Sequence, residues 1–75
     1  MEELLKFILN KIATKPDKVK VEKEEENNEI KFIISIDEVD KGRIIGKNGS
    51  NIKSIRLILS ILANKENKRV FLKVE

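Results

Sequence analysis

Two glycines three positions apart, Gly46 and Gly49, interrupt a region that otherwise has the apolar spacing of two helices. A glycine has no Cβ, so the backbone can turn sharply at these positions and bring a ligand against its own amide groups. Lys47 puts a positive charge at the centre of the turn. A helix that begins near Ser50 would add unpaired N–H groups and the positive end of its dipole. The segment therefore predicts two helices joined by a short glycine turn that binds phosphate.

The spacing excludes two common phosphate-binding loops. A P-loop has a glycine and a hydroxyl residue at the positions where this chain has Lys41 and Asn48. A dinucleotide fingerprint would need a further glycine in place of Ile44. A plain solvated turn stays an alternative, although the basic and apolar residues on both sides of the turn favour a binding loop.

Charge divides the chain into two unlike halves. Residues 1–40 carry seven lysines against eleven acidic residues, whereas residues 41–75 carry nine basic residues against two acidic ones. No carboxylate occurs between Lys41 and Lys65, so the positive field of the turn is not diluted by its sequence neighbours. This pattern favours an anionic ligand, although a merely solvated basic face is the alternative.

Length and composition limit the other possibilities. The 75 residues are enough for one domain with one core, and we expect residues 1–75 to form it. The chain has no Cys and no His, which removes disulfides, thiolate zinc sites and the usual general base. We therefore expect neither catalysis nor a metal or cofactor. The acidic N-terminus and the short apolar run Leu57–Ala63 predict no signal peptide and no membrane insertion, and so a cytoplasmic protein.

The hydrophobic pattern predicts an α+β fold. Apolar residues from Leu4 to Ile12 recur with helical spacing, which predicts an amphipathic helix over residues 2–14. Alternating residues around Val19–Val21 and over Ile30–Ile36 predict the two strands of a hairpin. We expect a short helix from an N-cap within residues 37–40 to Ile45, a long helix capped by Ser50 or Asn51 and ending near residue 64, and a last strand over residues 70–74.

These residues resemble a known family. The run Gly42–Gly49, followed by Ile52, Lys53, Ile55 and Arg56, is similar to the core of a KH domain, whose Gly-x-x-G loop clamps about four nucleotides of a single strand. The order α-β-β-α-α-β is that of type II KH domains, which have a three-stranded sheet with the helices packed on one face. Within them the whole chain resembles the stand-alone bacterial proteins of the KhpA type. Those proteins commonly have Arg after the second loop glycine, where this chain has Ser50.

The resemblance implies a single-stranded RNA-binding protein without catalysis or cofactor. It also implies a homodimer or a complex with a larger KhpB-type protein, action as an RNA chaperone or post-transcriptional regulator, and a part in cell-shape and peptidoglycan homeostasis. With only three aromatic residues, the chain is expected to seat bases in an aliphatic groove. Groove residues are Ile44, Ile45 and Ile52, each of which is also a candidate core residue. The full set of expected RNA contacts is Arg43, Ile44, Ile45, Gly46, Lys47, Asn48, Gly49, Ser50, Ile52, Lys53 and Arg56.

The long helix is predicted to have three faces. One apolar face is expected to join the core, and a polar face can meet ligand or water. The expected core residues are Ile52, Ile55, Ile58, Leu59 and Leu62, and the polar residues are Lys53, Arg56, Ser60 and Asn64. Leu57 and Ile61 widen the apolar arc beyond what one sheet face covers, so they either complete the core or form a subunit interface.

Two rival functions also fit the sequence. The first is an adaptor that keeps the KH fold for dimerisation and binds little RNA of its own. The second is a small phosphate-handling enzyme, which the absent His, Cys and P-loop hydroxyl make the weaker rival.

Overall fold

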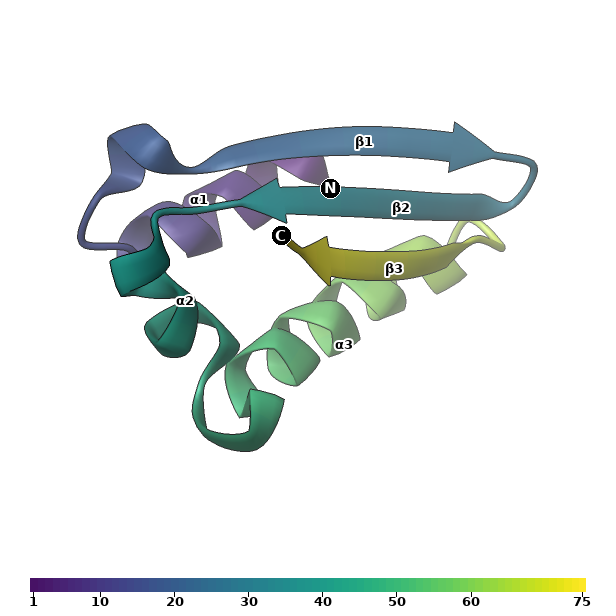
Figure 1. Cartoon of the computed structure of the whole chain (residues 1–75). Helices are drawn as coiled ribbons and strands as arrows, with labels where there is room; N and C mark the ends of the chain where they lie inside the picture. The colour runs from purple at the N-terminus through teal and green to yellow at the C-terminus, as the bar shows by residue number, and fades with distance from the viewer.

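The computed structural model describes residues 1–75 and has three helices on one face of a three-stranded sheet (Figure 1). Two short 3₁₀ turns, η1 and η2, are added to the expected order α-β-β-α-α-β, which is confirmed. In chain order the elements are α1 (Glu2–Ile12), η1 (Pro16–Lys18), β1 (Lys20–Glu26), β2 (Glu29–Ser35), α2 (Glu38–Ile45), η2 (Lys47–Gly49), α3 (Ser50–Asn64) and β3 (Arg69–Val74).

The sheet has the strand order β1-β2-β3, so β2 lies in the centre and both other strands are edges. β1 and β2 pair antiparallel, with Glu26 opposite Glu29 across a tight turn in which Asn27 has a φ of 54°. β3 pairs parallel with β2, and α2 and α3 supply the crossover that a parallel pair requires. The crossover carries the Gly46–Gly49 turn, which lies at the end of the molecule away from the β1–β2 turn (Figure 1).

The core lies between the sheet and the helices. Alternate residues of β2, namely Ile30, Phe32 and Ile34, are buried against α1 and α3, whereas their neighbours lie on the open face. Burying one such side chain contributes about 1.5–3 kcal/mol, so these contacts provide most of the stability of a small domain. The helices add Leu5, Leu9, Ile44, Ile55, Leu59 and Ala63, and β3 adds Val70.

The first helix is shorter than predicted because the carboxylate of a residue distant in the sequence accepts hydrogen bonds from the next backbone amides. It ends at Ile12 rather than at Thr14. The backbone N–H groups of Thr14 and Lys15 both donate to the carboxylate of Asp40, each at 3.0 Å, so neither can continue the helix. Sequence periodicity carries no information about such a partner.

Two further predictions about the long helix are wrong. Ile58 is 45% exposed and does not belong to the core, because the sheet covers only the arc that holds Ile55, Leu59 and Ala63. The N-cap of the long helix is Gly49 instead of Ser50 or Asn51, because Gly49 holds the left-handed conformation immediately before the first helical residue.

Candidate nucleic-acid interface

The helix that leads into the glycine loop is fixed at its start by Asp40. This carboxylate is 1% exposed and accepts three hydrogen bonds, from the Thr14 hydroxyl at 2.7 Å and from the amides of Thr14 and Lys15. The bond from the Thr14 hydroxyl, together with the one from its amide, lowers the pKa of Asp40. Asp37 caps the same helix by accepting the Val39 amide at 3.0 Å. The direction of α2, and so the place where the loop begins, is thereby tied to the end of α1.

Gly46 ends α2 in a conformation that only glycine adopts readily. Its N–H donates to the Gly42 carbonyl at 2.8 Å, and its φ of 77° with ψ of 176° turns the chain away from the helix. A Cβ at this position would lie 2.9 Å from the backbone nitrogen of Asn51 and 2.8 Å from its Cγ. The first glycine of the motif is therefore required both by its backbone angles and by the close approach of α3.

The loop itself is one tight turn. Asn48 and Gly49 both lie in the left-handed region, with φ of 57° and 75°, which Asn tolerates better than most other residues do. The Gly49 amide donates to the Gly46 carbonyl at 3.2 Å, and the Ser50 amide donates to the Lys47 carbonyl. Both of these amides are consequently used within the loop. The amides of Lys47 and Asn48 come before the first internal bond of the turn, where a helical turn has no partner for its N–H groups.

Asn51 connects the two helices that flank the loop. Its side-chain amide donates to the Arg43 carbonyl at 2.8 Å and so joins the last turn of α2 to the first turn of α3. From the sequence, Asn51 is predicted only as a candidate helix cap, and this bond is not predicted. The only sequence signal was an amide side chain two residues after the second glycine, which does not by itself identify the acceptor.

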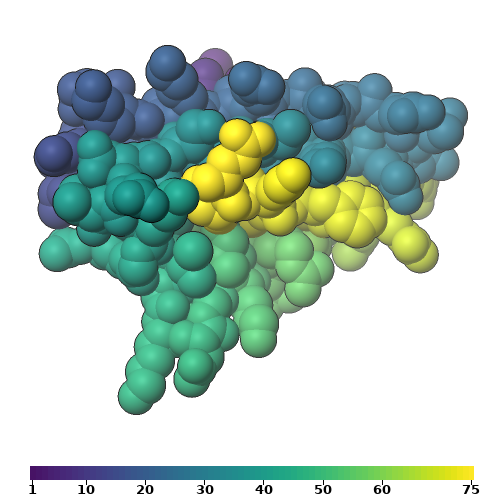
Figure 2. All heavy atoms as spheres, in the orientation of Figure 1, coloured from purple at the N-terminus to yellow at the C-terminus, as the bar shows by residue number.

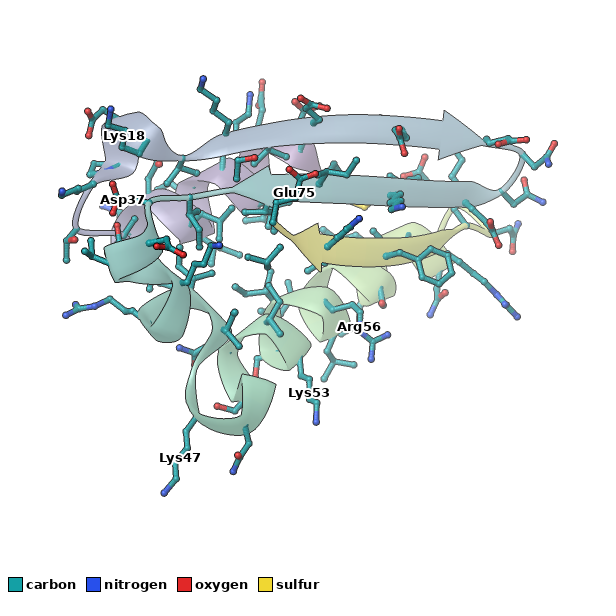
Figure 3. The ribbon with its side chains drawn as sticks, viewed as in Figure 1. Lys18, Asp37, Lys47, Lys53, Arg56 and Glu75 are labelled. Carbon is teal, nitrogen blue, oxygen red and sulfur yellow. The ribbon has the colours of Figure 1, made fainter.

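Four cations lie on the loop and on the two helices beside it. Arg43, Lys47, Lys53 and Arg56 are all exposed, and none of them forms an ion pair within the chain. Lys41 differs, because its ammonium group lies 3.8 Å from Glu38. Figure 3 shows Lys47, Lys53 and Arg56 extending from the loop and α3 away from the sheet. In the space-filling view, this end of the molecule projects from the body below β3 (Figure 2).

The three isoleucines predicted to form a groove have different positions. Ile44 is fully buried, so it supports the loop from within the core and offers no surface to a ligand. Ile45 and Ile52 are half-buried and lie on either side of the loop, which leaves part of each side chain accessible. Ser50 is exposed as the first residue of α3, and its carbonyl accepts the Ser54 hydroxyl at 3.0 Å.

Leu57 and Ile61 lie on the outer face of α3. They are 64% and 54% exposed, so the alternative that they complete the core is wrong. Together with Ile58 they form an apolar strip on the helix that also carries Lys53 and Arg56, and we call these three residues the outer strip.

The structure offers little for a bound metal. No group of three or more Asp and Glu residues is arranged to hold a metal ion. No helix is both long enough and apolar enough to span a bilayer.

Comparison with known proteins identifies the family. The KH-domain model of KhpA and KhpB matches residues 2–74. Proteins named "RNA-binding protein KhpA" from Thermotoga maritima, Chlamydia pneumoniae and Listeria monocytogenes are 38%, 34% and 31% identical over 74 residues. Each alignment covers 99% of this chain and 95–97% of the relative. These names describe binding proteins and not enzymes, in agreement with the expected function class. The chain therefore belongs to the KhpA/KhpB family of KH-domain proteins.

Proposed function

We propose that the protein binds single-stranded RNA and holds its sugar–phosphate backbone with the loop Gly46–Gly49. The observation that carries the proposal is the group of four cations without ion pairs beside a turn whose first two amides, those of Lys47 and Asn48, precede its internal hydrogen bonds. Phosphate satisfies both kinds of donor, because a charge-assisted bond to an anion is stronger than a bond to water or to a neutral group. The names of the relatives, which refer to RNA binding, support the choice of RNA as the ligand.

The proposed mechanism uses binding alone. The amides of Lys47 and Asn48 would meet one phosphate, and Arg43, Lys47, Lys53 and Arg56 would add charge along the strand. Bases would pack on the accessible parts of Ile45 and Ile52, which requires unpaired bases and so disfavours a duplex.

The test replaces Lys47 and Asn48 together by Asp. Both side chains are exposed, and Asp also tolerates the left-handed conformation of residue 48, so stability should change by less than about 0.5 kcal/mol. RNA binding, measured by fluorescence anisotropy with a short unstructured RNA, should be lost. The matched control is Asn10→Asp with Lys11→Asp, which makes the same charge change on α1 and should leave most of the affinity.

Salt dependence gives a second readout of the same binding. If about three phosphates are neutralised, log affinity should fall against log salt with a slope of about −2 for a single strand. Equal affinity of the wild type and the loop variant would mean that the loop is not the clamp.

We further propose that the outer strip on α3 joins two copies of the chain. Exposed apolar side chains that recur on one helix face are typical of a protein interface. Ile61→Asp would bury a carboxylate in that contact and should dissociate the dimer while the chain stays folded. Val39→Asp is the control, because Val39 is 66% exposed on another helix. Sedimentation of the wild type as a monomer at high concentration would contradict the dimer.

The outer strip also supports the rival function, an adaptor that dimerises and binds little RNA. Retained RNA affinity in monomeric Ile61→Asp would count against it.

By family resemblance we extend the proposal to the bacterial cytoplasm, to RNA chaperone or regulatory action with a KhpB-type partner, and to cell-shape and peptidoglycan homeostasis. Pull-down of a KhpB-type protein by the wild type, and its loss with Ile61→Asp, tests the partner.

A further inference from the structure

A hollow of about 300 Å³ lies between the second half of α3 and the start of β3. It lies along the polar face of α3, the helix that also carries Lys53 and Arg56. Its lining is Arg56, Ser60, Asn64, Arg69, Val70 and Phe71. Two guanidinium groups and one aromatic ring therefore border one small space, whose volume is at the lower end of the range for ligand pockets.

The ring of Phe71 does not serve the core. Its neighbours Val70 and Leu72 point to the helices, so strand alternation directs Phe71 to the open face, and it is 44% exposed. β3 is an edge strand, so the ring can border the open face and also the hollow beside α3, whose lining includes Phe71. The other exposed aromatic residue, Phe7, lies under the Lys11 ammonium group, 5.2 Å from the centre of its ring.

The polar residues of α3 connect the loop to this hollow. Lys53, Arg56, Ser60 and Asn64 follow one another at spacings of three or four residues, which places them along one side of the helix. With a rise of about 1.5 Å per residue, Asn64 lies about 20 Å along the axis from the loop. A strand longer than the four nucleotides that a KH loop clamps therefore has a charged path toward Phe71.

We propose that this hollow binds one further base of the strand, stacked on Phe71, with a neighbouring phosphate held by Arg56 and Arg69. The inference rests on the proposed function. On its other side the ring borders a hollow that is lined by four glutamates, Glu24, Glu25, Glu26 and Glu29, and by one cation, Lys31. These carboxylates repel phosphate, so the strand ends at Phe71 and does not cross the open sheet face.

The test compares a four-nucleotide with an eight-nucleotide unstructured RNA by fluorescence anisotropy. The wild type should bind the longer RNA more tightly. Phe71→Ala should weaken binding of the longer RNA about tenfold and leave the shorter one unchanged, as expected for the loss of one base–aromatic stack. Phe71→Leu, which keeps apolar bulk without a ring, should behave like Phe71→Ala. Phe7→Ala is the control and should change neither affinity.

The proposed contact between Arg69 and a phosphate is tested separately by the salt dependence of binding. Arg69→Gln should reduce the salt slope for the eight-nucleotide RNA by about 0.7, the value for one phosphate contact on a single strand, with no change for the four-nucleotide RNA. A slope that is unchanged for both RNAs would overturn the phosphate contact.

The outcomes separate this inference from the proposed function. If the short RNA binds but Phe71→Ala leaves the long RNA unaffected, the base site is wrong and the clamp stands. If Phe71→Ala weakens both RNAs equally, the ring acts on the fold, which also overturns the base site. If the wild type binds neither RNA, the proposed function fails and this inference fails with it.

Discussion

Charge is dense in two regions of the molecule, the basic loop with α3 and the acidic strand β1. On β1, Glu25 is paired within the chain, with Lys68 at 2.6 Å and Lys23 at 3.3 Å. The hydrogen bond from Lys68, followed by that from Lys23, lowers the pKa of Glu25, and the same bond raises the pKa of Lys68. The cations around the loop have no such partner. The Glu25–Lys68 ion pair thus connects the sheet to the α3–β3 connection, and the charges of β1 disfavour pairing of this edge strand with other chains. The charges at the loop, in contrast, are available to an external anion.

Charge reversal in each of these two regions tests the comparison with the largest expected effect. Lys53→Glu with Arg56→Glu should lower RNA affinity about 100-fold or more, since a hydrogen bond to a charged group contributes about 1.5–3 kcal/mol and two would be lost. Glu22→Lys with Glu24→Lys, on β1, should not lower it. Anisotropy at a fixed salt concentration measures both. A similar loss in the two variants would mean that overall charge, and not the loop surface, governs binding.

A pair of glycines tests the geometry of the loop apart from its charge. Gly46→Ala forces a Cβ against Asn51 at a positive φ and should cost about 1–3 kcal/mol of stability, together with much of the RNA affinity. Gly42→Ala lies inside α2, where no atom is within 4 Å of the new Cβ, and should raise stability by about 0.5–1 kcal/mol. Urea unfolding followed by circular dichroism gives both values. Equal effects of the two substitutions would contradict the assigned role of Gly46.

The buried carboxylate of Asp40 gives a pH-dependent prediction. Because its pKa is lowered in the folded chain, the unfolded chain binds a proton more readily, so Asp40 stabilises the fold above its unfolded pKa. That contribution is lost as the pH falls through the lowered pKa. Asp40→Asn should therefore melt at a lower temperature than the wild type at pH 7, and the difference should shrink in acid. A difference that stays constant down to strongly acidic pH would contradict this account.

The smallest expected effect concerns Asn51. Asn51→Ala removes the bond to the Arg43 carbonyl and should cost about 0.5–1.5 kcal/mol, with a several-fold loss of RNA affinity from a looser loop. Ser54→Ala is the control, because the Ser54 hydroxyl bonds only to a carbonyl of its own helix. Hydrogen exchange at the loop amides should quicken in Asn51→Ala alone. Unchanged exchange in that variant would mean that the loop holds its shape without the bond.

The sequence was informative where a feature depends on local pattern. The order of elements and the two-glycine turn follow from alternation, helical spacing and glycine positions, and the structure agrees with them. Features that depend on distant partners were missed. Thr14 lies outside the first helix because Asp40 accepts the hydrogen bond of its amide. Ile58 is exposed because the sheet does not extend over it. The side chain of Asn51 forms its hydrogen bond only because two helices meet at the loop. None of these partners is encoded in the spacing of neighbouring residues.

The most direct test of the central claim maps the binding surface on the protein itself. In an NMR titration of the ¹⁵N-labelled chain with a short unstructured RNA, the amides of Gly46–Lys53 and of Arg56 should shift, whereas those of Glu22–Glu26 on β1 should not. This result would place the ligand on the basic loop and the adjoining face of α3. Shifts confined to the sheet, or absent from Gly46–Gly49, would contradict the account.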